Sequence, residues 1–76
     1  LWGLSMGDWE YGYSHRMENI YFMYNTVYNA SDGGIRLQNK SARNVVVKNN
    51  TFNCLNPIAY LSVNWDELTV EDNQTG

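Results

Sequence analysis

The chain has 76 residues, a formal net charge of −3 and a single cysteine, Cys54, which provides no internal disulfide. Its five basic residues are scattered, so the sequence lacks the basic stripe with which proteins bind nucleic acid. No apolar run approaches the roughly 20 residues that a membrane-spanning helix requires. We therefore expect neither a nucleic-acid partner nor a membrane span, and we expect a thin core.

Short segments in which apolar and polar residues alternate recur along the chain. A period of two is the pattern of β-strands, because successive side chains of a strand point to opposite faces. The abundant asparagine and the tyrosine, tryptophan and valine residues also disfavour helices. In chain order, the sequence predicts strands over residues 4–6, 20–22, 35–37, 45–47, 58–60 and 68–70.

These strands form two series that repeat along the chain. The steps from Ile20 to Val45 and from Val45 to Leu68 are 25 and 23 residues. Ile35 precedes Val45 by ten residues, and Ile58 precedes Leu68 by the same number. A unit of this length with two or more short strands buries its inner face only by stacking on its neighbours, which produces parallel sheets. The repeat predicts an all-β solenoid of about three coils.

An asparagine follows the first apolar residue of the second series by five positions in every copy, at Asn25, Asn50 and Asn73. Stacked coils place these asparagines in a column. The column suits a corner, because the amide side chain tolerates left-handed turn geometry and hydrogen-bonds to its copy in the next coil. An antiparallel sandwich is the alternative; it also has short alternating strands, but it does not predict constant offsets.

The repeat resembles the right-handed parallel β-helix superfamily of pectate lyases, polygalacturonases and related glycoside hydrolases and epimerases. Asp32-Gly33-Gly34, just before a strand, is similar to a segment often found in the glycoside hydrolases of that fold. The resemblance implies one β-helix segment over residues 1–76, a polysaccharide or oligosaccharide partner, and a secreted, periplasmic or cell-surface location.

The function implied by this resemblance is that of a segment of a polysaccharide-degrading glycoside hydrolase. A polysaccharide lyase or epimerase is an alternative, and so is a non-catalytic glycan-binding or structural segment, as in adhesins and tailspikes. Three coils span only about 14 Å, and both ends expose strand edges and apolar core. We therefore expect either further coils in a longer protein or another chain stacked on the open ends.

The first coil differs from the others by an insertion. Leu4 precedes Ile20 by sixteen residues, where the later coils use ten, and the extra residues fall within 7–16. Long loops on a repeat scaffold are common binding sites. Aromatic rings stack on sugars and polar groups bind their hydroxyls, so we predict substrate binding by Trp9, Tyr11, Tyr13 and His15. In the alternative interpretation, Trp9 and one of the tyrosines fold back to shield the wall of the solenoid and the charged residues are solvated.

Asp32 is the main catalytic candidate. Glycoside hydrolysis requires two carboxyl groups roughly 5 to 9.5 Å apart, and Asp8 and Glu10 are the predicted partners of Asp32. Asp32 precedes its strand whereas Asp8 follows the aligned strand of the previous coil, so their pairing requires the loop to fold back. The alternative role of Asp32 is to cap a turn opened by Gly33 and Gly34.

Arg36 is predicted to point outward between Ile35 and Leu37, with the small residues Ser5 and Ala59 beside it. A guanidinium in this position could bind the carboxylate of an acidic sugar; an ion pair with Asp32 is the alternative. We predict no metal and no cofactor, because His15 is the only histidine and no aspartate-rich calcium cluster is evident.

Overall fold

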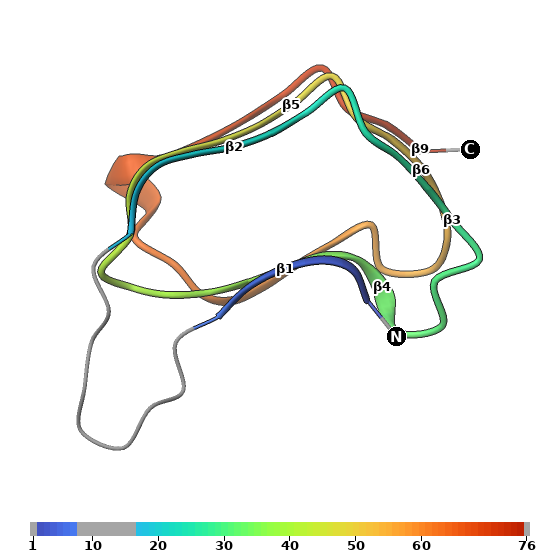
Figure 1. Cartoon of the computed structure of the whole chain (residues 1–76), viewed down its shortest axis with the longest axis horizontal. Helices are drawn as coiled ribbons and strands as arrows, with labels where there is room; N and C mark the ends of the chain where they lie inside the picture. Colours follow the sequence, from blue (N-terminus) through green and yellow to red (C-terminus); the bar gives the residue numbers. More distant parts are fainter. Residues whose placement is uncertain (1, 8–16, 76) are drawn as a thin grey trace.

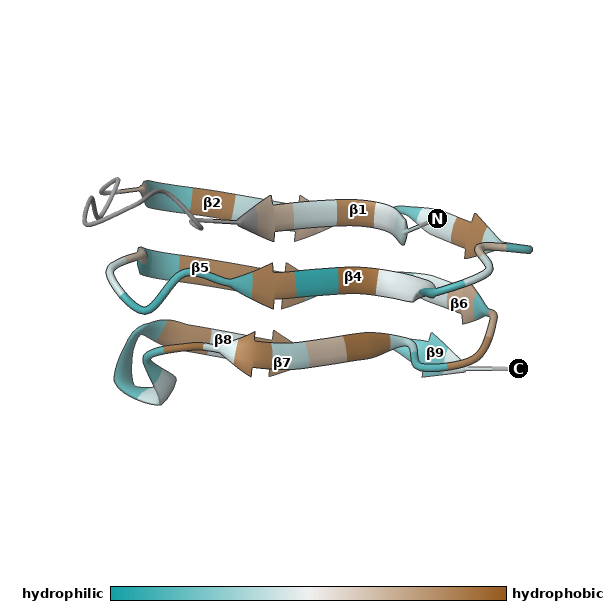
Figure 2. Ribbon diagram, turned by 90° about the horizontal axis from the view of Figure 1, so that it is seen from below, coloured by the Kyte–Doolittle hydropathy of each residue, from teal (hydrophilic) through white to brown (hydrophobic). Residues whose placement is uncertain are grey.

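The computed structural model describes residues 2–7 and 17–75, which form three stacked coils of a parallel β-helix (Figures 1 and 2). The first coil contains β1 (Trp2–Gly7), β2 (Glu18–Met23) and β3 (Thr26–Tyr28). The second contains β4 (Gly33–Gln38), β5 (Arg43–Lys48) and β6 (Thr51–Asn53). The third contains β7 (Ile58–Ser62), the 3-10 turn η1 (Trp65–Glu67), β8 (Leu68–Glu71) and β9 (Gln74–Thr75). The predicted all-β solenoid of about three coils is confirmed.

Three parallel sheets run along the solenoid, in the orders β1-β4-β7, β2-β5-β8 and β3-β6-β9. The first two are the predicted series in the predicted register: Leu4 pairs with Ile35, and Val45 pairs with both Ile20 and Leu68. The third sheet was not predicted. Its strands have two or three residues, and a single inward residue such as Phe52 leaves too little alternation to recognise.

The core is concentrated in the second coil. The side chains of Ile35, Leu37 and Val47 are completely buried, because the first and third coils cover them on both sides. Ile20 and Leu68, which pair with Val45 from the outer coils, are only half-buried. The same sequence pattern therefore yields different burial, and the hydrophobic stabilisation of each coil depends on its neighbours.

The predicted asparagine column is present and forms a continuous hydrogen-bonded ladder. The backbone N–H and Nδ2 of Asn25 both donate to Oδ1 of Asn50 at 3.0 Å, and the same two groups of Asn50 donate to Oδ1 of Asn73 at 3.0 and 2.9 Å. Nδ2 of Asn50 also donates to the carbonyl of Phe22 at 2.8 Å, as Nδ2 of Asn73 does to that of Val47 at 3.0 Å. Asn50 is 1% exposed and uses both amide hydrogens and its oxygen, so its burial carries no unsatisfied group.

The left-handed residue at this corner lies one position before the ladder. Tyr24, Asn49 and Asp72 have φ of 57°, 57° and 54°, whereas the ladder asparagines do not have positive φ. Left-handed geometry is therefore not the reason for asparagine in the column itself. The reason is the hydrogen bonding of the amide, and the preceding residue makes the turn.

Candidate functional site

The inserted loop of the first coil contains most of the residues predicted to act on a substrate. Asp8, Trp9, Glu10, Tyr11, Tyr13 and His15 all lie outside the described residues, so their roles stay predictions. Gly7 pairs with Gln38 at the end of β4, whereas Asp32 precedes the start of that strand. At about 3.3 Å per residue, these two points are about 20 Å apart. A carboxyl pair between the insertion and Asp32 therefore still requires the loop to fold back along the wall.

Asp32 is exposed and lies at the turn into the second coil. Its backbone carbonyl accepts a hydrogen bond from Nδ2 of Asn56 at 3.5 Å, which links it to the equivalent turn of the third coil. Gly33 has φ of 152°, as the predicted turn requires, and a Cβ there would lie 2.6 Å from the carbonyl oxygen of Asn56. Gly34 is needed for space, because a Cβ would lie 2.6 Å from the ring of Phe52. The two glycines thus let adjacent turns pack closely beside Asp32.

Arg36 takes the predicted outward position on the wall formed by β1, β4 and β7. Ser5 and Ala59 pair with it on either side, and its Nε donates to Oγ of Ser5 at 3.1 Å. A guanidinium carries five N–H donors, and this bond uses one of them. The bond to Ser5 holds the side chain along the wall, beside the first coil.

Three tyrosines form an exposed set on the outside of the first coil, which we call the tyrosine ridge: Tyr21, Tyr24 and Tyr28. Their side chains are 55%, 75% and 66% exposed. Tyr21 lies on β2, Tyr24 at the ladder corner and Tyr28 at the end of β3. The ridge was not predicted as a site, although the outward position of Tyr21 in the alternating pattern was a signal for it.

The ridge belongs to the first coil alone. The positions that align with its members in the second coil are Val46, Asn49 and Asn53. In the third coil, Thr69 aligns with Tyr21 and Asp72 aligns with Tyr24, and neither residue is aromatic. The tyrosine ridge is therefore a feature of the first coil and is separate from the exposed pair Tyr60 and Trp65 of the third coil, whose ring centroids are 4.8 Å apart.

Tyr24 stands out within the ridge because its backbone is left-handed. An L-residue in this conformation loses roughly 1–2 kcal/mol relative to ordinary backbone, and asparagine tolerates it best after glycine. The corresponding residues of the other coils, Asn49 and Asp72, are of the tolerant kind. The ring of Tyr24 is too exposed to compensate through core packing.

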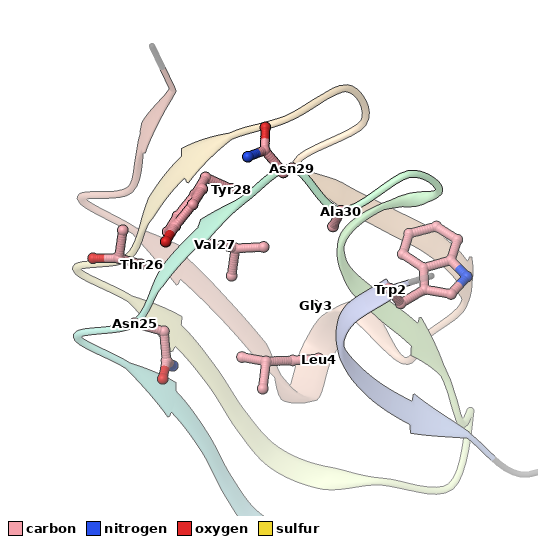
Figure 3. Close-up of a pocket in the computed structure, with 9 residues that line it drawn as sticks. All are labelled: Trp2, Gly3, Leu4, Asn25, Thr26, Val27, Tyr28, Asn29 and Ala30. Atoms are coloured by element: carbon pink, nitrogen blue, oxygen red, sulfur yellow. The ribbon is translucent and has the colours of Figure 1, made fainter.

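A cavity of about 360 Å³ opens at the first-coil end of the solenoid, the end that β1, β2 and β3 form. Figure 3 shows Leu4 of β1 and Val27 of β3 pointing toward one another across it, with Trp2 at its rim. Its lining includes Asn25 and Tyr28, which connects it to the ladder corner and to the ridge. The cavity is the interior of the first coil on the side away from the second coil.

Among the described residues, no histidine, cysteine, aspartate and glutamate side chains lie close enough together in groups of three or more to hold a metal ion. Within the same residues, no helix has the length and apolar character to cross a membrane.

Comparison with known proteins gives no match to this chain, either among protein-family models, among curated proteins or among solved structures.

Proposed function

We propose that this chain is a segment of an extracytoplasmic carbohydrate-active β-helix protein, and that its tyrosine ridge binds a polysaccharide. The observation that carries the proposal is Tyr24, a highly exposed aromatic residue in a strained backbone conformation. Strained residues are concentrated at binding and active sites. Because the ring of Tyr24 adds little to the core, an external ligand accounts for its presence at this corner.

The chemistry of the ridge favours a sugar as that ligand. A tyrosine ring offers a flat apolar face to the C–H groups of a pyranose, while its hydroxyl hydrogen-bonds to the hydroxyls of the sugar. Tyrosine also loses little conformational entropy on binding, since only two side-chain torsions become fixed. Oη of Tyr21 already accepts a hydrogen bond from Nδ2 of Asn44 at 3.1 Å, which holds that ring on the wall.

The parallel β-helix supports the same proposal. The chain is similar in its repeat to the β-helix proteins that act on pectin and other polysaccharides. Function belongs to sites rather than folds, so the fold adds to the argument only together with the ridge. Arg36, on a different sheet from the ridge, provides a second group that could bind the carboxylate of an acidic sugar.

Affinity electrophoresis through gels that contain soluble polysaccharides tests the ridge. We expect a neutral or acidic polysaccharide to retard the unmodified chain, and we expect Tyr24→Asn to remove most of the retardation without loss of folding. Asp72→Asn is the matched control, because it changes the same corner two coils away and leaves the ridge intact. Unchanged retardation of Tyr24→Asn, or no retardation of the unmodified chain by any polysaccharide, would contradict the proposal.

Glycoside hydrolysis is the second candidate function, and the exposure of Asp32 at a turn held by two glycines favours it. In this form of the proposal, Asp32 acts with Asp8 or Glu10 as the carboxyl pair. Release of reducing ends from the bound polysaccharide should be lost in Asp32→Asn while retardation in the gel is kept. Retained turnover in Asp32→Asn would exclude this assignment without affecting the binding proposal.

A further inference from the structure

The outer surface beside Tyr28 is polar but uncharged. The strands β3, β6 and β9, all of them described, contain no acidic or basic residue, and their exposed polar residues are Thr26, Thr51, Asn53, Gln74 and Thr75. The alternation that buries Val27 and Phe52 turns their neighbours outward, so stacking along the axis does not cover them. Hydroxyl and amide groups both donate and accept hydrogen bonds, as the hydroxyls of a neutral sugar require.

The neighbouring sheet, which carries Tyr21, is charged, and each of its cations stands beside a carboxylate. Nζ of Lys48 on β5 lies 3.7 Å from Oε2 of Glu71, its register partner on β8. Arg43, at the start of β5, pairs in the parallel register with Glu18 of the first coil. An anion that approached either cation would therefore compete with a carboxylate of the protein itself.

Carboxylates outnumber cations on this sheet. Across β2, β5, β8 and the residue that flanks each strand, all of them described, the acidic residues are Glu18, Glu67, Glu71 and Asp72 and the basic residues are Arg43 and Lys48. The acidic residues of the third coil lie two coils from the ridge, about 9.6 Å along the axis.

A pair of hydrogen bonds connects one of these carboxylates to the ridge. Oε1 of Glu67 accepts the backbone N–H of Asn44 at 3.3 Å, and Nδ2 of Asn44 donates to Oη of Tyr21 at 3.1 Å. The ridge therefore borders an uncharged surface on one sheet and a surplus of negative charge on the other.

We propose that the ligand of the tyrosine ridge is a neutral polysaccharide, and that the Lys48–Glu71 ion pair helps to exclude acidic ones. This inference rests on the proposed binding of a polysaccharide by the ridge. The carboxylates of an acidic chain would meet the negative surplus of the β2-β5-β8 sheet, and like charges repel across this distance at low salt. Arg36, which suits an acidic sugar, belongs to the β1-β4-β7 sheet and does not reduce this surplus.

Glu71 is the residue that decides how Lys48 acts. The side chains of Lys48 and Glu71 are 36% and 56% exposed, so both are accessible from the solvent that a ligand would occupy. While the pair is intact, a polyanion reaches Lys48 only by displacing Glu71. Without the carboxylate of Glu71, the same lysine would attract a polyanion to the corner next to the ridge.

Affinity electrophoresis with polymers that share a backbone and differ in charge tests the proposal. The probes are hydroxyethyl cellulose beside carboxymethyl cellulose, and galactomannan beside carboxymethyl galactomannan. We expect retardation by a neutral probe that depends on Tyr24, and roughly fivefold weaker retardation by its acidic partner at low ionic strength, where the Debye length is about 30 Å.

The outcomes separate this inference from the proposed function. Retardation that depends on Tyr24 and is equal or stronger with the acidic partner would overturn the inference and leave polysaccharide binding by the ridge standing. No retardation by any of the four polymers would contradict the inference together with the proposed function.

The dependence on salt gives a second readout. At about 0.15 M salt the Debye length falls to about 8 Å, so retardation by the acidic probe should increase toward that by the neutral probe. Retardation by the neutral probe should not change. A fall in retardation by the acidic probe on addition of salt would show attraction in place of repulsion and would refute the proposal.

The variant Glu71→Gln tests the ion pair itself. Because it removes one carboxylate and releases Lys48, we expect it to raise retardation by the acidic probes about threefold at low ionic strength. Asp66→Asn is the matched control: it removes the same charge from η1, at the other end of β8, and releases no partner of Lys48. Circular dichroism confirms that both variants fold. No rise in Glu71→Gln, or an equal rise in Asp66→Asn, would exclude a role for the pair in specificity.

Discussion

The first and second coils have the same repeat but differ in how completely they bury their inward residues. The second coil lies between two neighbours, and its inward residues Ile35, Leu37 and Val47 are fully buried. The first coil packs on only one other coil among the described residues, has a cavity over Val27 and carries the exposed tyrosine ridge. A solenoid coil therefore acquires its stability from its neighbours. The first coil, which departs from the repeat, has exposed aromatic residues where the second coil has none.

The largest expected effect is on stability, when leucine is replaced by alanine in the paired strands β1 and β4. We expect Leu37→Ala to lower the free energy of unfolding by about 3–5 kcal/mol, because the cavity that it leaves is enclosed on both sides. Leu4→Ala should lower it by about 1–2 kcal/mol, because Leu4 already borders an open cavity.

Urea unfolding followed by far-ultraviolet circular dichroism measures both losses. If Leu37→Ala does not fold and Leu4→Ala does, this result also supports the larger loss of stability expected for Leu37→Ala. Equal losses in the two variants would show that the first coil is as well packed as the second.

The ladder provides the next comparison. Asn50→Ala should lower the free energy of unfolding by about 3 kcal/mol, since it leaves buried partners of its amide without hydrogen bonds. Asn25→Ala should lower it by only about 1 kcal/mol, because the backbone N–H of residue 25 still donates to Asn50 and one side-chain bond is lost. The same unfolding measurement checks both variants. If Asn25→Ala lowers the free energy of unfolding as much as Asn50→Ala does, the expected difference between the first and second coils is wrong.

The smallest effect concerns the left-handed corner and should have the opposite sign in the two coils. Tyr24→Asn should raise the free energy of unfolding by about 1 kcal/mol, because asparagine adopts φ near 57° with less strain. Asn49→Tyr at the equivalent corner of the second coil should lower it by a similar amount. Thermal unfolding of the two variants beside the unmodified chain gives the comparison. A destabilised Tyr24→Asn would mean that the ring contributes to folding, and it would remove the main argument for the ridge as a binding site.

Much of the fold follows from the sequence because it depends on local alternation. The inward positions of Ile20, Val45 and Leu68 are set by a period of two, and their constant spacing determines which residues pair. The ladder was predictable for the same reason, since a repeated asparagine in a stacked repeat has only its own copies as neighbours. The site was less predictable. Arg36 points outward as expected, but a tyrosine in the sequence can be buried in a core or exposed, so the exposure of the ridge could not be predicted.

Alternation and spacing were therefore enough to predict about three coils, the register of two sheets and the position of the ladder. The third sheet, the left-handed backbone of Tyr24 in place of Asn25 and the location of the core in the second coil became evident only in the folded chain. This division arises because alternation and spacing are properties of neighbouring residues along the chain. Burial and backbone strain at a corner depend on coils that lie more than twenty residues away, and these become neighbours only when the coils stack.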